Sequence, residues 1–263
     1  MDLKLVNKKV FISGSTNGIG LAIARTFAKE NAIVYINGRT QNSVDAAIES
    51  IKNEVNQAKV TGIVADLTQL DGIDTVKNQI KEVDILINNL GIYEPRPFFE
   101  ITSEDWIRIF NINVLTGIQL TKHLMPAMLV KNWGRVLFIS SESGLQIPSE
   151  MIHYGMSKTA QIAIANGLAQ LTKGTGVTVN ALLPGPTYSA GVQQFIQDLA
   201  IANNQTTPEV EKEFFNETRP LSLLQRFITT EEVASMAVHL SSPLSAATNG
   251  AAVRVDGGIL KGI

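Results

Sequence analysis

Short apolar segments alternate with longer amphipathic segments along almost the whole chain. The apolar segments predict strands at 9–13, 32–37, 60–65, 84–88, 135–140, 177–183 and 251–255. The amphipathic segments predict helices at 19–30, 41–55, 69–81, 103–130, 154–173 and 230–240. Strands that are apolar on both faces, each followed by a helix, are typical of a parallel sheet covered on both sides. The sequence therefore predicts an α/β, doubly wound parallel sheet that binds its ligand at the carboxyl ends of the strands.

The length of 263 residues suits one large domain, although length alone would also permit two small ones. Hydrophobic residues make up 44% of the chain and charged residues 17%, which is the balance of a compact folded protein. Because no linker or repeat interrupts the alternation before Pro184, we expect residues 1–263 to form a single domain.

Charge and residue usage exclude several classes of function. The net charge is −2 and no basic run occurs, which argues against nucleic acid and against a membrane surface as partners. With no cysteine and three scattered histidines, the sequence predicts neither a disulfide nor a metal site. No apolar stretch approaches the ~20 residues of a membrane span and no signal-type core begins the chain, so we expect a cytoplasmic protein.

Residues 185–225 depart from the alternation. Three prolines surround two short predicted helices, at 191–202 and 208–218. A long excursion between sheet elements is usually functional, and we expect a lid over the substrate. A peripheral flap and a contact between subunits are the alternatives.

A glycine-rich turn joins the first predicted strand to the first predicted helix. Ser13 precedes Gly14, Gly18 and Gly20 in this turn. Gly14 would allow a tight turn, Gly18 would let a pyrophosphate approach the backbone, and Gly20 would let the helix start close to the strand. The free N–H groups of the helix would then bind the phosphates. A glycine-rich turn without a ligand is the alternative.

Tyr154 and Lys158 lie four residues apart in a predicted helix, so both side chains project from one face. A nearby ammonium favours the phenolate, and we expect it to move the tyrosine pKa down from ~10 toward neutrality, where the phenol can exchange a proton. This spacing also arises by chance, so the pair needs support from other motifs.

That support comes from the ends of two more predicted strands. Asn88-Asn89-Leu90-Gly91 follows one strand, and Ser140-Ser141 follows another, with Ser141 thirteen residues before Tyr154. Together with the glycine turn, these ordered motifs resemble the short-chain dehydrogenase/reductase family over essentially the whole chain. The resemblance implies a Rossmann-type sheet of about seven strands with helices on both faces.

The resemblance also implies a nicotinamide dinucleotide as cofactor. The chain has Ser13 where the family's turn usually has threonine, and Leu90 where its Asn-Asn-Ala-Gly element has alanine. Asp66 would meet the adenine and Thr187 the carboxamide. The cofactor-binding residues that it implies are Ser13, Gly14, Ser15, Asn17, Gly18, Ile19, Gly20, Arg39, Asp66, Leu67, Asn89, Gly91, Tyr154, Lys158, Pro184, Gly185 and Thr187.

The catalytic group implied by the resemblance is Asn113, Ser141, Tyr154 and Lys158. Ser141 would hydrogen-bond the substrate oxygen and Tyr154 would exchange its proton. Lys158 would lower the tyrosine pKa and hold the ribose, while Asn113 would support a water relay. Hydride transfer to a ketone develops charge on its oxygen, which such donors stabilise.

Neighbouring residues of the same type compete for two of these roles. Ser140 and Ser143 are alternatives to Ser141. Ser141 is favoured because it lies thirteen residues before Tyr154 and because a glycine follows three residues after it. Asn111 is the alternative to Asn113, which lies seven residues after Trp106 as family members commonly have it.

The choice between NADP and NAD depends on the end of the second predicted strand. No acidic residue stands there to accept the ribose hydroxyls of NAD, and Arg39 offers a planar fork for the 2′-phosphate of NADP. We therefore expect NADP, with NAD less favoured. An ordinary solvated arginine is the alternative.

We expect an oxidoreductase that interconverts a carbonyl and a secondary alcohol of a small molecule, and that assembles as a homo-tetramer or homo-dimer. A 3-oxoacyl thioester reductase and a non-catalytic NAD(P)-binding sensor are the alternatives, and an enoyl reductase is less favoured because its tyrosine and lysine usually lie further apart. Side chains that could line the substrate pocket are Tyr93, Glu94, Arg96, Glu142, Gln146, His153, Tyr188 and Phe195.

Overall fold

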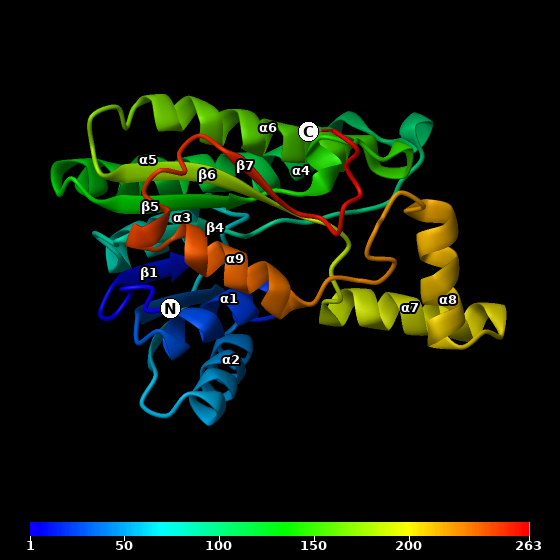
Figure 1. Ribbon diagram of the computed structural model, residues 1–263, viewed down its shortest axis with the longest axis horizontal. Helices are drawn as coiled ribbons and strands as arrows, with labels where there is room; N and C mark the ends of the chain where they lie inside the picture. The colour runs from blue at the N-terminus through cyan, green and yellow to red at the C-terminus, as the bar shows by residue number, and fades with distance from the viewer. Residues whose placement is uncertain (263) are drawn as a thin grey trace.

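A seven-stranded parallel sheet runs through the computed structural model, which describes residues 1–262 (Figure 1). The strand order is β3-β2-β1-β4-β5-β6-β7. The strands are β1 (Lys9–Ile12), β2 (Ile33–Gly38), β3 (Lys59–Val64), β4 (Ile85–Asn88), β5 (Gly134–Ile139), β6 (Val177–Pro184) and β7 (Ala252–Val255). The predicted Rossmann-type sheet, doubly wound and built as a single domain, is confirmed.

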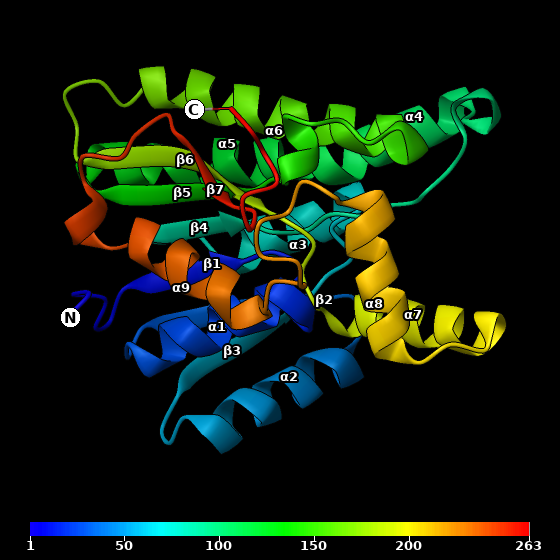
Figure 2. The same ribbon diagram turned by 45° about the vertical axis from the view of Figure 1, so that its right-hand side comes forward.

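Helices cover both faces of this sheet (Figures 1 and 2). One face carries α1 (Gly18–Lys29), α2 (Gln41–Glu54) and α9 (Thr230–Leu240), and the other carries α3 (Leu70–Gln79), α5 (Thr116–Val130) and α6 (Ile152–Gln170). In β1 the side chains of Val10 and Ile12 pack into the first layer and that of Phe11 into the second. This burial on both faces stabilises the fold and explains why the strands are apolar throughout.

The strand order reverses beside β1. The chain runs outward from β1 to β2 and β3, then returns to place β4 on the other side of β1. The connections that leave the carboxyl ends of β1 and β4 therefore diverge, and a crevice forms between them.

The segment predicted as one helix at 103–130 is divided, so that prediction was wrong in its interior. It contains α4 (Ser103–Phe110), a π-helical turn at Asn111–Leu115 and then α5. Thr102 and Asp105 form a capping box at its start. A π-helical turn contains one more residue than an α-helical turn. Hydrophobic periodicity continues through it, so the sequence pattern does not reveal this insertion. Turns of this kind occur mostly as single turns inside α-helices, often at functional sites.

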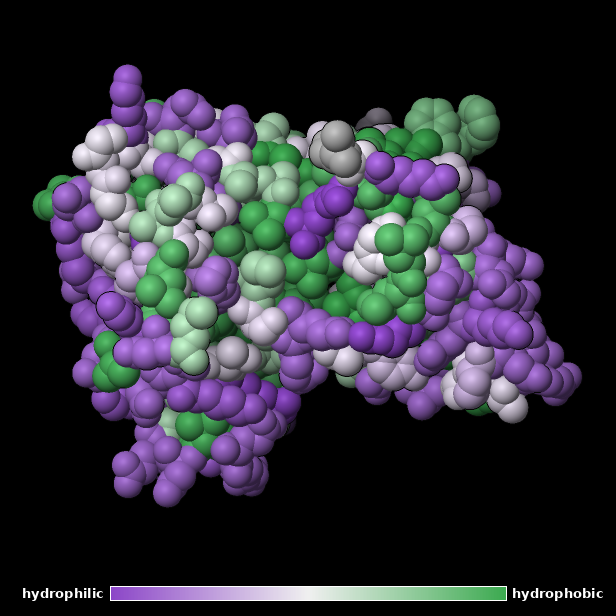
Figure 3. Space-filling model, viewed as in Figure 1, coloured by the Kyte–Doolittle hydropathy of each residue, from purple (hydrophilic) through white to green (hydrophobic). Residues whose placement is uncertain are grey.

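Residues 185–225 project from the sheet as two helices, α7 (Ala190–Asn203) and α8 (Thr207–Glu213), and a π-helical turn at Phe214–Thr218. A bridge between Thr187 and Ile228 closes the base of this segment. Ile196, Val210 and Phe215 of this segment form a separate small core with Phe227, which follows it. Hydrophilic side chains dominate the visible surface of α7 and α8, and hydrophobic ones gather where the following loop meets the sheet domain (Figure 3).

Short 3₁₀ turns complete the structure at Phe98–Glu100, Glu142–Gly144, Ser149–Met151 and Pro243–Ser245. Within residues 1–262, no helix has the length and apolar character needed to cross a membrane.

Candidate active site

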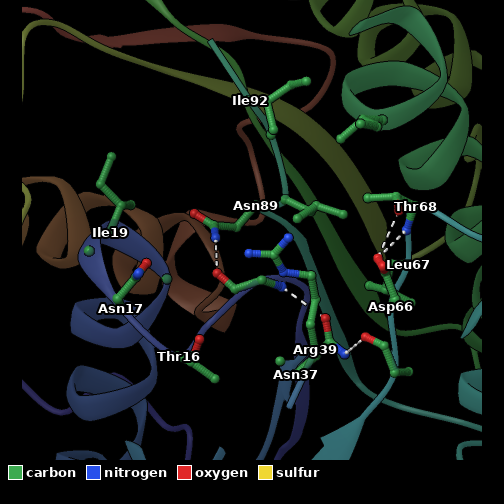
Figure 4. A pocket seen from close by; sticks show the side chains of 18 of the residues that line it. Thr16, Asn17, Ile19, Asn37, Arg39, Asp66, Leu67, Thr68, Asn89 and Ile92 are labelled. Atoms are coloured by element: carbon green, nitrogen blue, oxygen red, sulfur yellow. Dashed lines mark hydrogen bonds between the residues drawn. The ribbon is translucent and has the colours of Figure 1, made fainter. Parts of the chain in front are cut away.

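A cavity of about 390 Å³ occupies the crevice between β1 and β4 (Figure 4). Its walls come from the turns that follow β1, β2, β3 and β4. Most of the predicted cofactor-binding residues line it: Gly14, Asn17, Gly18, Ile19, Gly20, Arg39, Asp66, Leu67, Asn89 and Gly91. The sequence reasoning missed other lining residues on the same turns, among them Thr16, Asn37, Thr68 and Ile92. Their place directly beside predicted residues is the signal that could have found them.

The glycine turn has the shape that its spacing predicts. Gly14 and Gly18 adopt φ values of 58° and 54°, in the left-handed region that favours glycine. A Cβ on Gly20 would lie 2.7 Å from the Gly14 carbonyl oxygen, so only glycine lets α1 start this close to β1. The Asn89 amide donates to the Ser13 and Gly14 carbonyl oxygens at 3.0 and 2.8 Å and fixes the turn to β4. A cradle of this form fits a pyrophosphate at the N-terminus of α1.

Ser13 and Ser15 lie beneath the turn and are not among the residues that line the cavity, so their part in binding the cofactor stays a prediction. The Ser13 hydroxyl accepts from the backbone N–H groups of Asn89 and Leu90, each at 3.0 Å. The Ser15 hydroxyl donates to the Ile12 carbonyl oxygen at 2.7 Å. Both serines hold the turn in place from behind.

Asn37 and Arg39 occupy the end of β2. The buried Asn37 accepts from the Gly14 N–H at 3.1 Å and donates to the carbonyl oxygens of Ile63 and Ala65 at 3.2 and 3.0 Å. Arg39 is exposed, and its side chain extends into the cavity (Figure 4). Among residues 1–262, no carboxylate lies within ion-pair distance of its guanidinium.

A second cavity, of about 530 Å³, lies between the sheet domain and residues 185–225. Its lining includes Ser141 and Tyr154 together with Pro184, Gly185 and Thr187. Because Ile19 and Ser189 line both cavities, the two spaces adjoin. A nucleotide in the first cavity could therefore extend its reactive end toward Tyr154 in the second.

Three of the residues proposed to line the substrate pocket do so, namely Tyr93, Glu142 and Phe195. The other five are not among its described lining residues. Glu94 and Arg96 pair with each other in a surface cluster with Arg108. His153 is fully buried against Trp106, with ring centroids 5.8 Å apart, and burial lowers its pKa.

Lys158 is buried behind Tyr154 on α6 and lines neither cavity. Its Nζ donates to the Ile139 carbonyl oxygen at 2.9 Å and to Gln161 Oε1 at 3.1 Å, and lies 5.6 Å from the centre of the Tyr154 ring. Burial lowers the pKa of Lys158 from 10.5 to about 8. Gln161, which the sequence reasoning missed, thus orients the ammonium group.

The pKa of Tyr154 is raised rather than lowered, which contradicts the expectation from its spacing to Lys158. Burial is the main cause, and the carboxylate of Glu142 adds to it because a second negative charge nearby is unfavourable. The Ser141 hydroxyl acts in the opposite direction by hydrogen bonding to the phenol. The phenol therefore stays protonated in this environment.

Ser141 follows β5 and is 7% exposed. Its hydroxyl donates to the neighbouring Glu142 carboxylate. Of the alternative serines, Ser140 donates to the Lys158 carbonyl oxygen at 2.8 Å, whereas Ser143 donates to the same glutamate as Ser141, at Oε1 and 3.1 Å. Glu142 itself is 5% exposed and belongs to the site through contacts that the sequence reasoning did not foresee.

Asn113 sits in the π-helical turn and is 1% exposed. Its side chain accepts from the Ile92 N–H at 2.8 Å and donates to the Ile92 carbonyl oxygen and Ser157 Oγ, each at 2.9 Å. Its own carbonyl oxygen accepts from Gln161 at 2.7 Å. Asn113 therefore ties the loop after β4 to α6 and to the residue that orients Lys158.

Comparison with known proteins gives the family. The family model of the short chain dehydrogenases matches residues 8–200. The protein belongs to the short-chain dehydrogenase/reductase family. It is an NAD(P)-dependent oxidoreductase.

Individual relatives of this dehydrogenase/reductase span its full length or nearly so. It is 44% identical over 267 residues to the uncharacterized oxidoreductase YvrD of Bacillus subtilis (strain 168), covering 100% of both chains. It is 33% identical to the D-beta-hydroxybutyrate dehydrogenase of Rhizobium meliloti (strain 1021), covering 96% of this chain and 98% of that one. Among solved structures, it resembles L-sorbose reductase from Gluconobacter frateurii complexed with NADPH and L-sorbose. That likeness has a TM-score of 0.94, 27% identity and 100% coverage of both chains.

Proposed function

We propose that this enzyme reversibly reduces the carbonyl of a small organic substrate with NADPH, through Ser141, Tyr154, Lys158 and Asn113. The observation that carries the proposal is the joining of the two cavities at Ile19 and Ser189. Tyr154, the proton donor in this proposal, lines the second cavity, which adjoins the space proposed for the dinucleotide. The reverse reaction oxidises the corresponding secondary alcohol.

The chain supplies the proton and the charge stabilisation for this reaction, and the bound nicotinamide would supply or accept the hydride. Tyr154 donates its phenolic proton to the substrate oxygen as negative charge develops there. The buried ammonium of Lys158 stabilises the phenolate that remains. Asn113 keeps the loop after β4 and α6 in the relative position that this transfer needs.

Ser141 has one hydroxyl proton, and the Glu142 carboxylate accepts it. In this state Ser141 can accept from the hydroxyl of an alcohol substrate but cannot donate to the Tyr154 oxygen. To donate to a ketone oxygen, its hydroxyl must rotate away from Glu142. The glutamate therefore adjusts how strongly Ser141 binds each of the two substrate forms.

NADP is the cofactor that the site favours in our proposal. Arg39 extends into the dinucleotide cavity with no carboxylate partner among residues 1–262, and β2 ends in the neutral Asn37 and Gly38. The guanidinium suits a 2′-phosphate, and no acid stands there to repel it. The NADPH in the L-sorbose reductase complex is consistent with this assignment. The assembly as a homo-oligomer and the role of residues 185–225 as a lid also stay predictions.

The test is spectrophotometric turnover with NADPH and NADH over ketones, aldehydes and 3-oxoacyl thioesters, with the Tyr154→Phe variant as the matched control. We expect wild-type turnover with NADPH on ketones or aldehydes. The control should bind NADPH normally but lose at least ~10²-fold in kcat, because it lacks the phenolic hydroxyl that supplies the proton. Preference for acyl thioesters would favour the thioester reductase. NADPH binding with no turnover on any of these carbonyls would favour the sensor.

A further inference from the structure

The second cavity contains a small charged cluster at the point where residues 185–225 meet the sheet domain. Among the described residues that line this cavity, only Glu142, Glu150 and Arg219 carry charge. Arg219 Nε lies 3.5 Å from Glu142 Oε1, and one of its terminal nitrogens lies 3.2 Å from Glu150 Oε1. The Arg219 side chain is 12% exposed and that of Glu142 6%, so this pair is largely shielded from solvent.

Two carboxylates share this single guanidinium, which leaves one net negative charge on the cavity wall. The Glu150 side chain is 42% exposed and can turn to solvent, but Glu142 is 6% exposed, so a substrate carboxylate or phosphate at Arg219 would still meet or displace a buried glutamate. Unpaired charges in such surroundings are strongly unfavourable. The cluster therefore discriminates against anionic substrates.

Glu142 can still accept one more hydrogen bond. Its two oxygens offer about four acceptor positions. Ser141 uses one position on Oε2 and Ser143 one on Oε1, while Arg219 lies 3.5 Å from Oε1 as an ion-pair partner. The carboxylate lines the cavity beside Ser141 and Tyr154, the residues that would hold the reacting oxygen. A hydroxyl on the carbon next to the reacting carbon is thus within the reach of its remaining position.

The rest of the cavity wall is mainly apolar. Phe195, Leu199 and Phe214 line it from residues 185–225, together with Phe227 just after that segment and Met151 from the sheet domain. Aromatic and aliphatic side chains favour an apolar group on the substrate. The cavity therefore combines one hydroxyl-accepting position near the chemistry with a hydrophobic region beyond it.

We propose that Glu142, Arg219 and Glu150 select an uncharged α-hydroxy ketone, or the corresponding vicinal diol, that carries an apolar substituent. The substrate hydroxyl donates to Glu142, the apolar substituent occupies the aromatic region, and the shared guanidinium leaves no site for an anion. This inference rests on the proposed function and names the substrate class of that same site.

The test uses three phenyl ketones that differ in one substituent: acetophenone with a methyl group, α-hydroxyacetophenone with a hydroxymethyl group and phenylglyoxylate with a carboxylate. With NADPH and the wild-type enzyme, we expect kcat/KM for α-hydroxyacetophenone to exceed that for acetophenone by about 10- to 100-fold. Phenylglyoxylate should fall at least ~10-fold below acetophenone, because its charge meets the negative wall.

A Glu142 variant and a control variant separate the effect of the glutamate on substrate preference from the intrinsic reactivity of the three ketones. Glu142→Gln keeps the volume but removes the charge, so the hydroxymethyl-to-methyl ratio should fall by at least ~10-fold and phenylglyoxylate should gain relative to acetophenone. Asp198→Asn is the matched control, because Asp198 is an exposed acid of α7 that does not line the cavity. It should leave both ratios unchanged.

Three results would overturn the proposal. One is a preference of the wild-type enzyme for phenylglyoxylate over α-hydroxyacetophenone, and another is a set of ratios that Glu142→Gln does not alter. The third is inactivity on all three ketones in an enzyme that reduces other carbonyls. Each of these leaves the proposed carbonyl reduction intact. If no carbonyl is reduced at all, the proposed function fails and the substrate class fails with it.

Discussion

Replacing Lys158 with methionine should alter the pH dependence of folding stability in a way that burial of the ammonium dictates. The pKa of Lys158 falls from 10.5 to about 8 in the folded protein, because burial disfavours the charged form. Between these two values the unfolded chain binds more protons than the folded one. The wild-type free energy of unfolding therefore rises with pH from about 8 to 10.5, and this contribution is lost as the pH falls through 8.

The size of the effect follows from the same two pKa values. The full difference, at about 1.4 kcal/mol per pH unit, corresponds to about 3 kcal/mol. Over the practical range from pH 7 to 9.5, linkage gives the wild type a gain of about 2 kcal/mol relative to Lys158→Met. The hydrogen bonds from Nζ to Ile139 and Gln161 contribute to the stability of the wild type at both pH 7 and pH 9.5. Their contribution therefore largely cancels when the gain between these two pH values is compared.

Urea denaturation of the cofactor-free protein at pH 7, 8 and 9.5 measures this gain. Lys122→Met, at an exposed position on α5, is the matched control and should follow the wild type at every pH. Lys158→Met should also lose kcat, which links the stability effect to the residue that catalysis uses. Parallel stability curves for wild type and Lys158→Met would refute the reasoning, since they would mean that the buried ammonium titrates as it does in the unfolded chain.

Three further predictions concern cofactor choice, the segment at 185–225 and Asn113. Arg39→Ala should raise KM for NADPH and leave KM for NADH little changed, shifting the preference by about ten- to a hundredfold, since only NADPH loses a charge-assisted contact; equal changes for both, or a wild type that already prefers NADH, would identify an ordinary surface arginine. Residues 185–225 should resist limited proteolysis more strongly when NADPH and substrate are both bound, whereas identical digestion in every state would favour a subunit contact. Asn113→Ala should lower the free energy of unfolding by about 2–3 kcal/mol in urea titrations, because buried groups of Ile92 and Ser157 lose their partners; a loss of activity without a loss of stability would contradict the positioning role.

Local sequence patterns were sufficient to predict the parallel sheet and the shape of the glycine turn after its first strand. Strands such as β1 are apolar on both faces because helices cover both sides, and this requirement is visible in the order of residues alone. The backbone roles of Gly14 and Gly20 were predicted correctly, because a left-handed φ and a close approach of backbones leave glycine as the residue that fits. The four-residue spacing likewise put Tyr154 and Lys158 together on α6.

The tertiary structure decided what depends on partners that are distant in the sequence. Periodicity could not reveal the π-helical turn around Asn113, because that turn is held by contacts to the loop after β4. Spacing also gave the wrong direction for the Tyr154 pKa, since burial and the Glu142 carboxylate act on the phenol.

The pairing of Glu142 with Arg219 joins residues more than seventy positions apart, so no local pattern encodes it. By itself the sequence determined the sheet, the glycine turn and the types of residue at the site, because each of these follows from the geometry of a short stretch of backbone. The protonation of those residues and the charge of the substrate cavity depend on burial and on long-range contacts, which only the folded chain creates.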